Sequence, residues 1–347
     1  MKLIHRTLAG LLLVAGFSSA QASTEKVVLK VSHFLPAHTV TQVNFIEPWC
    51  EKLNKESKGQ IECQIYPAMQ LGGSPAQLLT QARDGIADIV WTLPGYTPGR
   101  FPVSEIFESP FFVADNESGS RALWDFVQKH AQEEFAGLKP IAVWLNGPNL
   151  FHLRNKEVGT ADDLKGLKVR AASRLSNKFL AGIGTSATGM PLPQSVEALS
   201  KGVIDGLLAP WEVIPAMKIN EIANFHVEVK DEQGRGMATS TLIYVMNKKK
   251  YDSLSPELKK VIDDNSGPES SAWMGRNISD ADVVGRQKTV ERGNKIVQMP
   301  PAEVAKLKSA TENIVQEWIA DMNSKGKDGQ AIYNDATALV QKHTDAK

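Results

Sequence analysis

Apolar and polar positions along the chain follow two periods, one typical of strands and one typical of helices. Alternating or continuous apolar runs predict strands at 27–31, 61–66, 86–91, 140–145, 167–171 and 203–208. Apolar residues at helical spacing predict helices over 40–57, 75–83, 118–134 and 194–200, with another through Phe179 and Leu180 and a mostly helical tail from Glu303 onward. This alternation of strands and helices predicts an α/β architecture.

One turn pattern occurs twice. Gly85 and Asp88 are followed 117 residues later by Gly202 and Asp205, and both pairs stand between a helix and an apolar strand. In each copy glycine provides the left-handed end of the helix and Gly-x-x-Asp leads into the strand. A chance likeness of two such turns would not require the matching aspartate. The repeat therefore predicts two similarly wound lobes.

The N-terminus has the order of a secretory signal. Lys2 and Arg6 precede an apolar run at 8–17, and Ala20-Gln21-Ala22 supplies a small-residue cleavage site. The run is shorter than the roughly 20 residues that a spanning helix needs. We expect residues 1–22 to be removed and the mature chain to be periplasmic.

The charge that remains does not indicate a nucleic-acid surface. Cleavage removes two basic residues and no acidic ones, which leaves 37 basic and 39 acidic residues. A nucleic-acid-binding domain would carry a clustered excess of Lys and Arg.

Two cysteines occur, Cys50 on the apolar side of a predicted helix and Cys63 on the buried face of the following strand. In an oxidising compartment the pair either forms a disulfide or remains as two buried apolar thiols. Neither alternative indicates catalysis.

Motifs of the common enzyme classes are missing. The sequence has no phosphate-binding loop, no strand-first dinucleotide fingerprint, no Gly-x-Ser-x-Gly elbow and no metal-ligand spacing among its histidines. We therefore expect neither a cofactor nor a metal, and no enzyme activity.

Several segments carry a resemblance to a known family. They are Val31-Ser32-His33-Phe34-Leu35-Pro36, Tyr66-Pro67-Ala68-Met69-Gln70-Leu71-Gly72-Gly73, Asp163-Leu164-Lys165-Gly166-Leu167-Lys168-Val169-Arg170 and Ala198-Leu199-Ser200-Lys201-Gly202-Val203-Ile204-Asp205-Gly206. In this order they resemble the DctP-type periplasmic solute-binding proteins of TRAP transporters.

The resemblance implies a two-lobed periplasmic binding protein fold with hinge-crossing strands and a long C-terminal helix. It places lobe I at 24–148 plus about 238–285, and lobe II with the C-terminal helices at 149–237 plus about 286–347. It also implies a small organic carboxylate as ligand and the integral membrane permease subunits of a TRAP transporter as partners.

Arg170 is the strongest candidate for the ligand-binding site. Leu167 and Val169 share one face of their strand, so Arg170 faces the other side, at the strand end where open α/β sheets place ligands. A guanidinium matches a carboxylate through two parallel hydrogen bonds. The matching arginine of the family holds the substrate carboxylate.

Further candidates follow from position in the family pattern. Phe34, Trp91 and Leu192 are expected to border the cleft, and Tyr96 and Trp211 to supply a hydroxyl donor and an apolar wall. Ordinary core packing is the alternative for each aromatic side chain. Asn149 and His152 lie where other members place a second polar or basic ligand, although for His152 a structural role is the preferred interpretation.

The departures from the family pattern concern the ligand. Leu207, Leu208 and Ala209 stand where many members carry Gln-Glu-Asn, and 149–152 lacks the second arginine that other members have. A second buried carboxylate would then be unpaired, which favours a monocarboxylate with an apolar or aromatic body. The alternative functions are an exported enzyme acting on a small organic acid and a sensory binding protein of the same fold.

Overall fold

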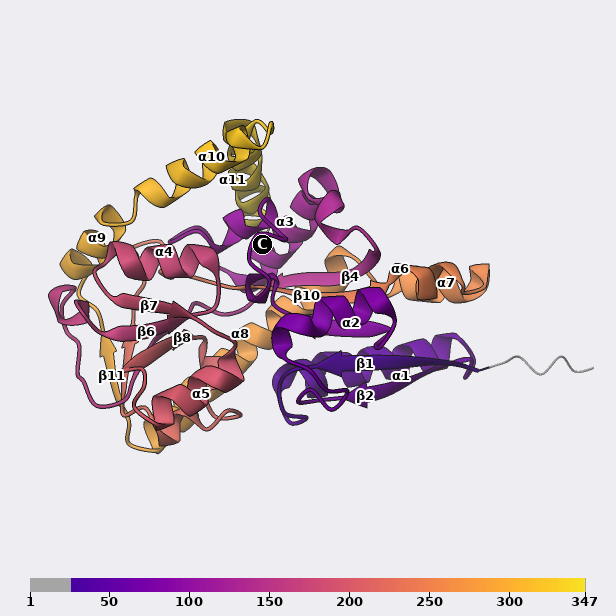
Figure 1. Ribbon diagram of the computed structural model, residues 1–347, viewed down its shortest axis with the longest axis horizontal. Coiled ribbons are helices and arrows are strands. Elements are labelled where there is room, and N and C mark those ends of the chain that lie inside the picture. The colour runs from indigo at the N-terminus through magenta and orange to yellow at the C-terminus, as the bar shows by residue number, and fades with distance from the viewer. Residues whose placement is uncertain (1–25, 347) are drawn as a thin grey trace, which may run out of the picture.

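The computed structural model describes residues 26–346 and contains two separate β-sheets, each the centre of one lobe (Figure 1). The predicted signal segment lies outside the described residues. The first sheet has the order β2-β1-β3-β10-β4, formed by Ile61–Tyr66, Val27–His33, Ile89–Thr92, Thr241–Asn247 and Leu138–Leu145. The second has the order β11-β9-β5-β8-β6-β7, formed by Lys295–Gln298, Phe225–Glu228, Leu150–Leu153, Gly206–Ala209, Lys168–Ala171 and Ser186–Gly189. The predictions of an α/β class and two lobes are confirmed.

The repeated Gly-x-x-Asp turn plays the same part in both sheets. Gly85 and Gly202 adopt left-handed backbone angles, with φ of 78° and 70°. Asp88 Oδ2 accepts from the Lys30 amide of β1 at 2.8 Å, and Asp205 Oδ2 accepts from the Lys168 amide of β6 at 2.8 Å. Each aspartate thus ties the turn to the neighbouring parallel strand, which explains why both copies carry it.

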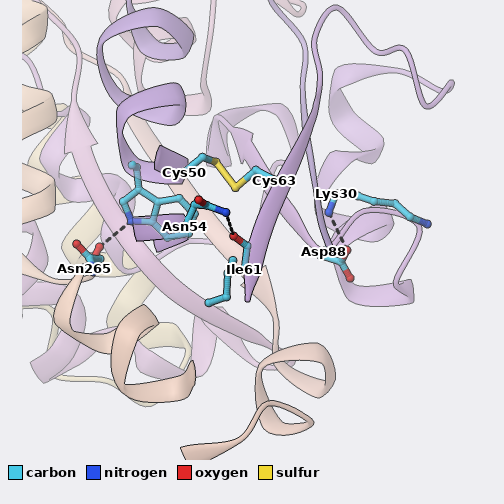
Figure 2. Close-up of a disulfide and its surroundings, with 8 residues drawn as sticks. Lys30, Cys50, Asn54, Ile61, Cys63, Asp88 and Asn265 are labelled. Atoms are coloured by element: carbon cyan, nitrogen blue, oxygen red, sulfur yellow. Dashed lines mark hydrogen bonds between the residues drawn. A yellow bond between two sulfur atoms is a disulfide. The ribbon is translucent and has the colours of Figure 1, made fainter. Parts of the chain in front are cut away.

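A disulfide joins helix α1, Glu47–Glu56, to strand β2. Cys50 and Cys63 are bonded, with their Cα atoms 5.8 Å apart (Figure 2). Of the two alternatives for this pair, the structure has the disulfide. Close by, Asn54 donates to the carbonyl of Ile61 at 2.8 Å, so the start of β2 is fixed to the same helix.

The remaining α-helices cover the sheets and connect the lobes. They are α2 Leu78–Asp84, α3 Asn116–His130, α4 Arg174–Gly182, α5 Leu192–Ser200, α6 Lys248–Asp252, α7 Pro256–Asp264, α8 Pro268–Glu291, α9 Pro301–Ser309, α10 Asn313–Ser324 and α11 Gly329–Asp345. The long helix α8 packs against α3 and β4 of the first lobe and against the short helix Trp211–Val213 of the second. From α9 beside the second sheet, α10 and α11 pass over the top of the molecule to α3 (Figure 1).

Besides the connection through α8, the chain crosses between the lobes in two adjacent segments, 146–149 and 229–240. Their backbones are hydrogen-bonded to each other, from the Asn146 amide to Ser240 O at 3.0 Å and from the Asn149 amide to Ala238 O at 2.9 Å. The crossing therefore consists of two paired extended segments. Within 26–346 no helix is long and apolar enough to cross a membrane.

Candidate ligand-binding cavity between the lobes

A cavity lies between the lobes, at the carboxyl ends of β1 and β3 on one side and of β6 and β8 on the other. Of its seventeen lining residues, twelve are apolar or aromatic: Phe34, Leu35, Trp91, Leu93, Tyr96, Ala172, Leu192, Leu208, Ala209, Pro210, Val213 and Leu242. The other five are Asn146, Asn149, Arg170, Glu212 and Ser240. The space that atoms leave free, the open mouth included, is about 380 Å³. Only about 30 Å³ of this space has room for a water-sized sphere, far below the roughly 300–1,000 Å³ of small-molecule pockets, so the lobes lie nearly closed over the site in this conformation.

Arg170 reaches the cavity from strand β6. Its neighbour Val169 is buried in the core of the second lobe, so the alternation of the strand turns Arg170 to the opposite face. Its Nε donates to Met190 O at 2.7 Å and one terminal nitrogen donates to Leu208 O at 3.0 Å. The other terminal nitrogen lies 3.5 Å from the Tyr96 hydroxyl. These bonds fix the plane of the guanidinium.

The charge of Arg170 is buried without a counter-ion. The residue is 2 % exposed, and it forms no ion pair with any carboxylate in the described part of the chain. Burial lowers the pKa of Arg170, while the Tyr96 hydroxyl opposes this effect. The guanidinium has five N–H groups, and the three bonds above use three of them. The other two are free to donate, which is the number that a carboxylate accepts in a bidentate pair. The arrangement can therefore hold an anion at the side of the cavity.

Aromatic side chains of the first lobe form the facing wall. The ring of Phe34 lies 5.1 Å from that of Trp91 and 5.4 Å from that of Tyr96, between ring centres. The Tyr96 hydroxyl also accepts from the Leu192 amide at 3.1 Å, so this side chain bridges the two lobes. Burial raises the pKa of Tyr96, which keeps the hydroxyl protonated. Trp91 Nε1 has no partner among the described residues, but surrounding protein atoms cover it.

The structure brings together six of the eight predicted site residues and leaves two outside. The cavity is lined by Arg170, Phe34, Trp91, Tyr96, Asn149 and Leu192, whereas His152 and Trp211 lie outside it. The two lie together within the second lobe, with His152 bonded to Ala209 O at 3.1 Å and to His226 Nδ1 at 2.6 Å. Trp211 donates to Glu228 at 2.8 Å, and its ring centre lies 5.3 Å from that of His152.

Three polar lining residues were not predicted from the sequence. Asn146 and Ser240 belong to the crossing segments and bond to Asn149, at 3.4 Å and 3.2 Å respectively. Glu212 follows Trp211 in the short helix after β8. No sequence motif includes these three residues. The signal that could have found them is their position, in a segment between the lobes or just after a strand. Within 26–346 no group of three or more His, Cys, Asp or Glu side chains is arranged to hold a metal ion.

Comparison with known proteins agrees with this geometry. The model of the bacterial extracellular solute-binding protein family 7, DctP, matches residues 31–321. The chain belongs to this family. Its members are periplasmic solute-binding proteins, and the recognition made from the sequence motifs is confirmed.

Solved structures of family members superpose over most of the chain. A TRAP solute-binding protein from Rhodoferax ferrireducens, in complex with copurified benzoate, is 43 % identical with a TM-score of 0.90, covering 92 % of this chain and 99 % of its own. A marine metagenome protein specific for aromatic acids, in complex with 3-hydroxybenzoate, is 41 % identical with a TM-score of 0.89 and the same coverage. One from Bordetella bronchiseptica, with bound (R)- and (S)-mandelate, is 25 % identical with a TM-score of 0.84, covering 91 % and 99 %.

Proposed function

We propose that this protein is the periplasmic substrate-binding subunit of a TRAP transporter and captures a small monocarboxylate with an apolar or aromatic body. The observation that carries the proposal is Arg170, a buried guanidinium without a counter-ion in a cavity that is otherwise mainly apolar. The benzoate, 3-hydroxybenzoate and mandelate complexes of similar proteins support the same ligand class. The partners of such a subunit are the integral membrane permease subunits.

Capture proceeds by closure of the lobes. The ligand carboxylate binds Arg170 of the second lobe first, and the Phe34, Trp91 and Tyr96 side chains of the first lobe then cover the ligand's body. Exclusion of water strengthens the ion pair, because the effective dielectric constant falls. In this mechanism lobe I, 24–148 plus about 238–285, moves against lobe II, 149–237 plus about 286–347. The crossing segments 146–149 and 229–240 form the hinge.

The C-terminal helices, assigned above to lobe II, contact both lobes. Helix α11 packs against α3 of the first lobe, whereas α9 and β11 stay with the second. The tail therefore contacts both lobes, and α10 spans the distance between them.

Residues 1–22 direct export to the periplasm and are then cleaved, and the mature protein binds its ligand without converting it. N-terminal sequencing of the periplasmic form should begin at Ser23. Mass spectrometry of a ligand recovered after prolonged incubation should return the unaltered acid. A product of different mass would identify an enzyme instead.

Calorimetry with a panel of acids tests the ligand class. We expect benzoate or mandelate to bind at least about 100-fold more tightly than succinate, because the cavity offers a second carboxylate no cation and leaving it unpaired costs several kcal/mol. Tighter binding of succinate or malate than of any aromatic or 2-oxo monocarboxylate would contradict the proposal.

A further inference from the structure

A second ionisable residue lines the cavity that holds Arg170. Glu212 lines the cavity from the short helix Trp211–Val213 and is 9 % exposed. Its backbone amide donates to Asp282 Oδ1 at 2.8 Å, which anchors this helix to α8. Within 26–346 no donor bonds to the Glu212 carboxyl group. The residue lines the cavity and also a surface hollow bordered by His38 and Asn44, and no described protein group occupies its carboxyl group on either side.

The two ionisable groups of the cavity do not pair with each other. All the bonds of Arg170 go to the carbonyls of Met190 and Leu208 and to Tyr96. A buried guanidinium and a buried carboxylate in contact would attract each other strongly, and the anion site would be lost. Their separation leaves Arg170 for a carboxylate and Glu212 for a different group of the same ligand.

The amide side chains in the cavity are already engaged. The Asn146 side chain donates to Asn149 Oδ1, and Asn149 Nδ2 in turn donates to Ser240 Oγ. Asn146 Oδ1 accepts from the Ser240 amide at 2.7 Å. Glu212 therefore supplies the cavity's carboxyl group that remains open to a polar group on the ligand body.

The environment of Glu212 favours its uncharged form. Burial raises the pKa of Glu212 well above its ordinary value, and the neighbouring Asp282 carboxyl raises it further. A protonated carboxyl group both donates and accepts hydrogen bonds. It also does not repel the carboxylate of a ligand bound nearby.

We propose that Glu212 is a specificity-determining residue that selects monocarboxylic acids carrying a hydroxyl group on their body. The inference rests on the proposed function, because Arg170 must first orient the ligand through its carboxylate. A ligand hydroxyl buried beside Glu212 gains a hydrogen bond. A ligand without the hydroxyl group leaves the Glu212 carboxyl group buried and unpaired, which weakens binding.

Calorimetry with acids that differ by one hydroxyl group tests this inference. The probes are benzoate, 3-hydroxybenzoate and 4-hydroxybenzoate, bound to the mature chain at pH 7. We expect wild-type protein to bind one hydroxylated acid at least about tenfold more tightly than benzoate. Glu212→Met, of similar length but apolar at its end, should reduce this ratio to about twofold or less, and Glu212→Gln should keep most of it.

Glu221→Met is the matched control, since Glu221 is an exposed glutamate of the same lobe and the ratio should stay at the wild-type value. Equal binding of the three acids to wild-type protein overturns the inference, and so does a ratio that survives in Glu212→Met. In both cases the acids still bind, so the proposed function stands. If none of a wider panel of monocarboxylates binds wild-type protein, the proposed function fails and this inference fails with it.

Discussion

At the scale of single residues, the cavity is organised around charge that the protein leaves uncompensated. Arg170 is bonded to two carbonyls and a hydroxyl, which fix its orientation but do not neutralise it. Removing a charge from water is costly unless it is paired. An anionic ligand supplies the missing partner, so the buried charge becomes a source of binding energy.

Tyr96→Phe tests the contact between the lobes. The variant loses the acceptor of the Leu192 amide and the hydroxyl beside Arg170, while the ring that faces Phe34 remains. Loss of a buried hydrogen bond that leaves its partner unsatisfied costs about 1–3 kcal/mol. We expect ligand binding to weaken about tenfold in calorimetry. Unchanged affinity would show that Tyr96 does not support the closed form.

His33 gives a pH dependence of stability with a defined sign. Burial lowers the pKa of His33 to about 4, below the value of about 6.5 expected for unfolded chain. The stabilisation is fully present above pH 6.5 and is lost as the pH falls toward 4, because the unfolded chain takes up the proton first.

The comparison of wild type with His33→Gln isolates this effect, since a glutamine amide can replace the donor to Gln42. Between pH 7 and pH 4.5 the free energy of unfolding of wild type should fall by about 2–3 kcal/mol more than that of the variant. Parallel curves in urea unfolding would contradict the assignment.

At the scale of elements, the sequence predicted the strands and turns that a local residue pattern determines. The strands at β1, β2 and β4 and the two Gly-x-x-Asp turns follow from apolar alternation and from the left-handed backbone that glycine permits. The strand predicted at 86–91 begins later, at Ile89, because residues 86–88 form the turn itself.

The apolar pattern did not predict helix α8, because its packing does not depend on an apolar stripe. A Cβ at Gly275 would lie 2.6 Å from Asn116 O, and one at Gly285 would lie 2.1 Å from Trp211 O. The helix thus joins both lobes through close backbone approach at glycines, which hydrophobic periodicity does not indicate. The apolar pattern did not indicate Glu212 either, because Glu212 lines a cavity that exists only when the first lobe lies against the second.

The disulfide joins helix α1 to strand β2 and stabilises the first lobe. The bond closes a loop between residues 13 apart, for which the chain-entropy estimate is about 3 kcal/mol. Cys50→Ser/Cys63→Ser should lose about 2–4 kcal/mol of unfolding free energy. Ligand affinity should stay close to the wild-type value, because neither cysteine lines the cavity. Equal stability of the two proteins in urea unfolding would contradict this role.

At the scale of the whole molecule, the crossing segments and α8 connect two lobes that meet around the cavity. Arg174 of α4 pairs with Glu105 of the first lobe, and Tyr96 reaches the second lobe beside Arg170. Contacts of this kind form only when the lobes are together. A ligand that joins Arg170 to the aromatic wall of the first lobe adds to the same set of contacts and favours closure.

The most direct test of the account is the affinity of Arg170→Ala for the tightest-binding monocarboxylate of the panel, measured by calorimetry. We expect a loss of about 2–5 kcal/mol, as for other buried charge pairs that lose one partner. The control is Arg276→Ala, an exposed arginine of α8 that pairs with Glu117 and should bind as wild type does. Wild-type affinity in a folded Arg170→Ala would contradict the central claim that Arg170 anchors the ligand's carboxylate.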